Sequence, residues 1–296
     1  MIPQLVLFSI YVSLSRQISK CQSFHGRKLI IRLYFYHQHL VKMSIYMIPS
    51  ELYPYFLNRV DFLDVVRFSY TCAKIRSEVI TYLPQRVTEL IGSYCERPYE
   101  LATILDDTDS FITGLSTLPF IFPQVLPHLY HDPISLTISC LTSNIPTFLR
   151  FFSSVNFDTD YYMALDPSDY PNSLLLSRPG SRISVVLLHD NCSPFFKLPS
   201  FPYTAMMNAI SPYSYTFLYP VPTFASLTLA NDSIPDFLVN WRFFDDSTII
   251  AAQNTLSDYQ FTIMETQHAN NHLCPKSGCR SYRRNDDTQT FHLRFN

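Results

Sequence analysis

The sequence is poor in glycine, in charged residues and in tryptophan. Five glycines stand beside 21 prolines among 296 residues. Fourteen of these prolines fall between Pro119 and Pro222, which predicts short strands joined by stiff loops. Because 16% of the residues are charged and 47% are hydrophobic, the composition excludes a chain that is disordered overall. The chain can bury a core, and its length predicts two units of structure.

Long hydrophobic runs and paired cysteines are also missing. The run from Leu5 to Leu14 is too short to span a bilayer, and no basic residue precedes it as one does in a secretory signal. Seven scattered cysteines, an odd number, favour reduced thiols over a disulfide framework. We therefore expect a cytoplasmic or nuclear protein without a membrane partner. Nucleophile-elbow, metalloprotease, P-loop and dinucleotide-binding motifs are absent.

Charge is unevenly distributed along the chain. Residues 1–43 contain six Lys or Arg and no acid, so residues 44–296 carry 16 basic against 24 acidic residues, a net charge of −8. A body this acidic is a poor surface for nucleic acid, and we expect no such partner. Residues 1–43 follow neither a helical nor a strand period, which predicts a poorly ordered extension. A targeting segment is the alternative.

Residues 44–94 have the pattern of a helical hairpin. The stretch from Pro49 to Leu52 is typical of a helix start, because Ser50 can accept from an unpaired backbone N–H there. A second start is expected at Asp61 or Asp64, and apolar residues then recur at three- and four-residue steps as far as Leu83.

This module resembles an F-box, the helical module that docks onto the adaptor subunit of cullin ubiquitin ligases. The residues that carry the resemblance are Ile48-Pro49, Glu51-Leu52, Asp64-Val65, Ser69, Cys72 and Leu83. The resemblance implies that Pro49, Leu52, Val65 and Cys72 bind that adaptor. A helical lid without a partner is the alternative.

The stretch from Ser110 to Leu141 predicts strand, glycine turn, helix and strand. Gly114 lacks a Cβ and can turn tightly after the first strand. An apolar run from Leu118 to Leu129 follows. From Pro133 to Ile138, apolar and polar residues then alternate at the two-residue period of a half-buried strand.

This stretch resembles the nucleotidyltransferase fold of the DNA polymerase β superfamily. That fold has a Gly-Ser or Gly-Gly turn, a helix, and a strand with two carboxylates at i and i+2. With Gly114 and Ser116 at the turn, the metal-binding positions fall on Pro133 and Ser135, and a third position, on a later strand, falls on Ser184. None of the three is acidic. The resemblance therefore implies a degenerate site, a pseudoenzyme without cofactor.

A nucleotidyltransferase with a displaced metal site is the alternative. Asp132 would supply a carboxylate together with Asp158 or Asp160, and Ser116 would contact phosphate. Asp132 lies one residue out of register, however, and a one-residue slip turns a side chain to the opposite face of a strand.

Two further strands complete the expected sheet. Leu174–Leu176 and Ile183–Leu188 are apolar and joined through a Pro-Gly turn. Because the alternating apolar sets need a common buried face, we expect Ser135 and Ser184 on neighbouring strands of one sheet. The expected fold class is α+β, an N-terminal helical hairpin followed by a mixed sheet with helices packed on it.

From about Ile48 onward the chain resembles a group of proteins of mushroom-forming fungi that join an F-box-like start to a degenerate nucleotidyltransferase-like domain. The residues that carry this resemblance are Gly114-Leu115-Ser116, Ile134–Thr137, Arg182–Val186, Met206–Ile210, Tyr219-Pro220 with Thr223, and the Cys-containing tail. The implied organisation is an extension (1–43), the helical module (44–94) and the α/β domain (95–296). The implied function is a non-enzymatic interaction protein, an F-box-like substrate adaptor of a ubiquitin ligase.

Near the C-terminus, two histidines and two cysteines have a spacing that could suit a tetrahedral zinc ion. They are His268, His272, Cys274 and Cys279. Four basic residues flank them, which disfavours a dication unless both thiols ionise. We therefore expect a surface loop without a metal.

Overall fold

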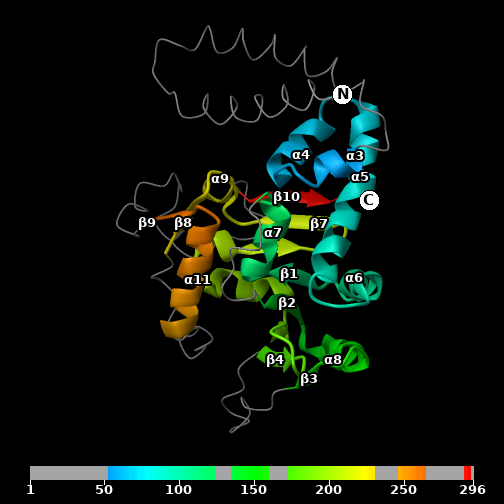
Figure 1. Ribbon diagram of the computed structural model, residues 1–296, viewed down its shortest axis with the longest axis vertical. Helices are drawn as coiled ribbons and strands as arrows, with labels where there is room; N and C mark the ends of the chain where they lie inside the picture. Colours follow the sequence, from blue (N-terminus) through cyan, green and yellow to red (C-terminus); the bar gives the residue numbers. More distant parts are fainter. Residues whose placement is uncertain (1–52, 125–134, 160–172, 231–245, 265–289, 295–296) are drawn as a thin grey trace. The chain divides into compact units, whose positions relative to one another are not determined.

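The computed structural model describes residues 53–124, 135–159, 173–230, 246–264 and 290–294. The chain divides into two compact units, Met1–Tyr53 and Pro54–Asn296, and the second contains nearly all of the described residues. Figure 1 shows its helices and strands. None of the helices in these ranges combines the length and the apolar character that a bilayer crossing requires. The extension predicted at residues 1–43 lies outside the described residues.

The described part of residues 44–94 contains three helices where the sequence predicts a hairpin of two. They are α3 (Tyr53–Leu57), α4 (Phe62–Ser69) and α5 (Ala73–Gly92). The predicted second helix is therefore wrong as a single element, because it is interrupted after Ser69. The hydroxyls of Ser69 and Thr71 donate to the carbonyls of Val66 and Phe68 at 2.6 and 2.8 Å, and such local bonds compete with helix continuation.

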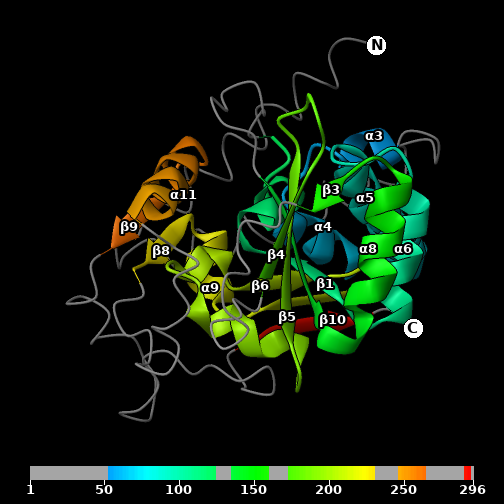
Figure 2. The same cartoon turned by 90° about the horizontal axis from the view of Figure 1, so that it is seen from below.

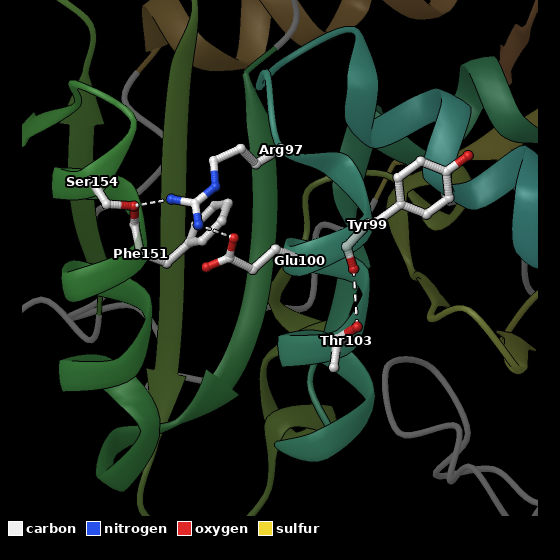
Figure 3. A network of polar contacts seen from close by, with 6 residues as sticks. All are labelled: Arg97, Tyr99, Glu100, Thr103, Phe151 and Ser154. Atoms are coloured by element: carbon white, nitrogen blue, oxygen red, sulfur yellow. Dashed lines mark hydrogen bonds and ion pairs between the residues drawn. The ribbon is translucent and has the colours of Figure 1, made fainter.

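The next helix, α6 (Pro98–Asp107), begins at a proline, a residue favoured at the first helical position. Arg97 precedes it and joins it to α8 (Ile145–Ser154). Its guanidinium lies between the carboxylate of Glu100, with which it forms an ion pair, and the Ser154 hydroxyl, to which it donates at 2.9 Å (Figure 3).

The second unit contains an eight-stranded sheet in the order β10-β7-β6-β1-β2-β5-β4-β3. The strands are β1 (Phe111–Thr113), β2 (Leu136–Leu141), β3 (Asp158–Thr159), β4 (Ser173–Ser177), β5 (Ser184–Asp190), β6 (Asn208–Ile210), β7 (Ser214–Phe217) and β10 (Phe291–Arg294). Strands β2 and β5 run parallel, and the other neighbours run antiparallel. The predicted α+β class with a mixed sheet is confirmed.

Shorter elements connect these strands. They are η2 (Gly114–Thr117), α7 (Leu118–Ile121), η4 (Thr142–Asn144), η7 (Pro194–Ser200), η8 (Thr204–Met206) and α9 (Pro220–Phe224). A separate parallel pair, β8 (Leu227–Leu229) and β9 (Thr262–Met264), accompanies α11 (Asp246–Asp258). Figure 2 shows α6 and α8 on one side of β5, and α9, β8 and α11 on the other.

Strands β2 and β5 bury one face and leave part of the other half-exposed. Leu136 and Ile138 lie beside Val185 and Leu187 in the parallel register, and all four are 0% exposed. This common buried face is the one that the alternating apolar pattern predicts. On the opposite face Thr137 is half-buried.

Phe62, the first residue of α4, is 0% exposed and lies inside an aromatic cluster. Five ring centroids from α7, β7, α9 and β10 lie 5.1 to 6.3 Å from its own: Phe120, Tyr215, Phe217, Phe224 and Phe291. Helix α4 therefore shares its core with the sheet. From Pro54 onward, the range 44–94 accordingly lies in the same compact unit as the strands.

Arg86 of α5 joins the helices to this core. Its side chain is buried at 4% exposure, and it donates to the carbonyl oxygens of Val60, at 3.0 Å, Leu57 and Phe120. The guanidinium carbon also lies 5.1 Å from the centroid of the Phe120 ring, a cation–π contact. Burial lowers the pKa of Arg86, and the carbonyl acceptors compensate for its lost hydration.

Candidate functional site

The glycine turn that the sequence singles out lies between β1 and α7. Gly114 has φ +68°, a left-handed conformation that other residues adopt at a cost. The Ser116 hydroxyl donates to the carbonyl of Thr113 at 2.6 Å and accepts from the backbone N–H of Thr137 at 3.2 Å. Ser116 is also 0% exposed. The predicted order of strand, glycine turn, helix and strand is confirmed, and Ser116 fastens the turn to β2.

The helix after the turn is shorter than the pattern predicts. Within the described residues α7 ends at Ile121, although the apolar run continues to Leu129. Phe122 leaves the helical conformation at φ −126° and ψ 72°, because the residue before a proline disfavours the α region and Pro123 follows. Residues 125–134 lie outside the described residues, including the two positions Asp132 and Pro133.

Ser135 and Ser184 lie side by side. Strands β2 and β5 are neighbours, and the two side-chain oxygens Ser135 Oγ and Ser184 Oγ are 2.6 Å apart. The prediction that these serines occupy neighbouring strands of one sheet is confirmed for Ser184, the first residue of β5. Ser135 precedes the first residue of β2, so the regular strand begins later than the alternation predicts. The two hydroxyls satisfy each other where the resemblance places carboxylates.

Phe201 covers the glycine turn. A Cβ added to Gly114 would lie 3.1 Å from Cε1 of Phe201 and 3.6 Å from Oγ1 of Thr137. Phe201 is 2% exposed and Gly114 is itself buried. The space beside the turn is thus filled by an aromatic ring of the same chain, which the sequence reasoning did not foresee.

The one described acid of the displaced-site alternative lies far from the turn. Asp158 of β3 pairs with Ser177 of β4, which pairs with Ser184 of β5. Because neighbouring strands are about 4.8 Å apart, Asp158 lies about 10 Å from Ser184. Asp160 lies outside the described residues.

Potential metal ligands do not converge in the described part of the chain, where no group of three His, Cys, Asp or Glu side chains could hold an ion. The four weak zinc candidates, His268, His272, Cys274 and Cys279, lie outside the described residues.

Of the four predicted adaptor-binding residues, two are described. Val65 is 0% exposed, so it packs inside the helical region, and Cys72 is half-buried. Pro49 and Leu52 lie outside the described residues. Because Val65 is fully buried, its side chain offers no surface to a partner in this conformation.

Cys140 and His189 form another pairing that the sequence reasoning missed. They occupy paired positions on β2 and β5, and His189 Nδ1 lies 3.1 Å from Thr142 Oγ1. A thiol beside an imidazole is a potential nucleophile. However, Cys140 is 0% exposed and its burial raises its pKa to about 12, so the thiol stays protonated at neutral pH.

Arg86 was also missed, although its position carries a signal. Arg86 lies three residues after Leu83 and four residues before Leu90, and all three belong to the buried face of α5. An arginine on the apolar face of a helix predicts a buried cation with carbonyl partners.

Comparison with known proteins adds no relative, because no family model, no curated protein and no solved structure matches the chain.

Proposed function

We propose that this protein is a non-enzymatic interaction protein whose nucleotidyltransferase-like turn has become part of the core. The observation that best supports this proposal is the contact between Phe201 and Gly114. A turn that receives phosphate must leave its backbone open to the ligand, whereas here an aromatic ring lies against it.

The neighbouring hydroxyls support the same proposal. The Ser116 hydroxyl is hydrogen-bonded to two backbone groups, and the hydroxyls of Ser135 and Ser184 are hydrogen-bonded to each other. Phosphoryl transfer requires carboxylates that converge on magnesium, and neither serine can supply that charge. The acidic body, with a net charge of −8 over residues 44–296, also repels a nucleoside triphosphate.

A transfer assay tests the loss of activity. The full chain is incubated with magnesium and each of the four labelled ribonucleoside triphosphates, and we expect no transfer to RNA, protein or a small hydroxyl acceptor. The matched variant is Asp132→Asn. Transfer that disappears in this variant would overturn the proposal and establish the displaced-site enzyme.

The finer proposal is that the N-terminal helices bind the adaptor subunit of a cullin ubiquitin ligase. It rests on the F-box-like residue order from Ile48 to Leu83, on the short helices α3 and α4, and on the longer helix α5 that follows them. Since Val65 is buried, Pro49 and Leu52 would provide the contact and Val65 would support it from inside.

Binding of purified adaptor subunit to the full chain tests this role. Combined Pro49→Ala and Leu52→Ala should abolish binding while the thermal unfolding temperature stays unchanged. Lys74→Ala, at an exposed position at the start of α5, is the control and should bind normally. If the folded wild-type protein does not bind the adaptor, this role is wrong, although the non-enzymatic assignment would stand.

A further inference from the structure

We draw no further inference here: the strongest candidate, the row of half-buried hydroxyls formed by Ser177 of β4, Ser184 of β5 and Ser135 just before β2, carries nothing because nothing in the described part of the structure shows what covers it.

Discussion

Two regions beside the sheet are packed by different kinds of side chain. Around Phe62, large aromatic rings from helices and strands fill the interior, and Arg86 ties three backbone carbonyls together beside them. Around Gly114, small hydroxyl side chains bond to the backbone, and the ring of Phe201 covers the turn.

The comparison shows which interactions stabilise each region. The aromatic region depends on volume, so it tolerates few smaller side chains. The glycine turn depends on one backbone conformation and on local hydrogen bonds from Ser116 and Thr117, none of which involves an acid. The geometry of this turn therefore does not depend on carboxylates.

The largest effect is expected from Phe62→Ala. Removing this fully buried ring should lower the free energy of unfolding by about 3–5 kcal/mol, because it leaves a cavity between α4 and the sheet. Denaturant unfolding followed by both circular dichroism and tyrosine fluorescence measures it. Tyr55→Ala, at a side chain 74% exposed, is the control and should change stability by less than about 0.5 kcal/mol. Unfolding of the helices in a separate, unaffected transition would show that they do not share the core.

Arg86→Met should have the second largest effect. The methionine keeps much of the volume but leaves the carbonyls of Leu57, Val60 and Phe120 without this donor, at a cost of about 2–4 kcal/mol. The same denaturant experiment measures the loss, and Arg76→Met, exposed on the same helix, should be nearly neutral. Equal stability of the two variants would mean that Arg86 contributes packing alone.

Gly114→Ala compares the turn with a matched glycine elsewhere. Gly114 and Gly180 both have positive φ, +68° and +73°, so alanine is strained at both, by about 1–2 kcal/mol. Only at Gly114 does the added Cβ meet a ring, at 3.1 Å, whereas nothing lies within 4 Å of it at Gly180. Thermal unfolding should thus show a larger loss for Gly114→Ala, by about 1 kcal/mol or more. Adding Phe201→Leu should recover part of that difference, and no recovery would contradict the contact.

The smallest effect concerns the thiols. Burial raises the pKa of Cys140 to about 12, so this thiol should stay protonated and unreactive in the folded protein even at pH 9, while the exposed Cys192 is alkylated. Peptide mass mapping after brief alkylation separates the two sites. Alkylation of Cys140 at a rate similar to that of Cys192 would show that β2 opens readily.

The parts of this fold that follow from local rules were predictable from the sequence. The positive φ of Gly114 follows from its place after a strand, and the pairing of β2 with β5 follows from two apolar sets that need one buried face. The class α+β and the position of Ser135 beside Ser184 were predicted on this basis.

The parts that depend on distant contacts were not predictable. Phe201 lies far from Gly114 in sequence, and nothing in its neighbourhood indicates which backbone it covers. Likewise, the apolar face of α4 shows that Phe62 is buried, but no local pattern states that its partners come from β7 and β10. The sequence did not predict the helix break after Ser69, because the apolar period continues across it. The Ser69 hydroxyl bonds to the backbone at the point where the helix ends.

Titration of magnesium ATP into the chain of 296 residues tests most directly the claim that the glycine turn no longer receives a nucleotide. With Phe201 against Gly114 and the hydroxyls of Ser116, Ser135 and Ser184 already bonded within the chain, we predict no saturable heat at millimolar nucleotide. Phe201→Ala, which exposes the turn without adding any acid, should also bind no magnesium. A saturable, magnesium-dependent heat in the wild-type protein that Asp132→Asn removes would contradict the account.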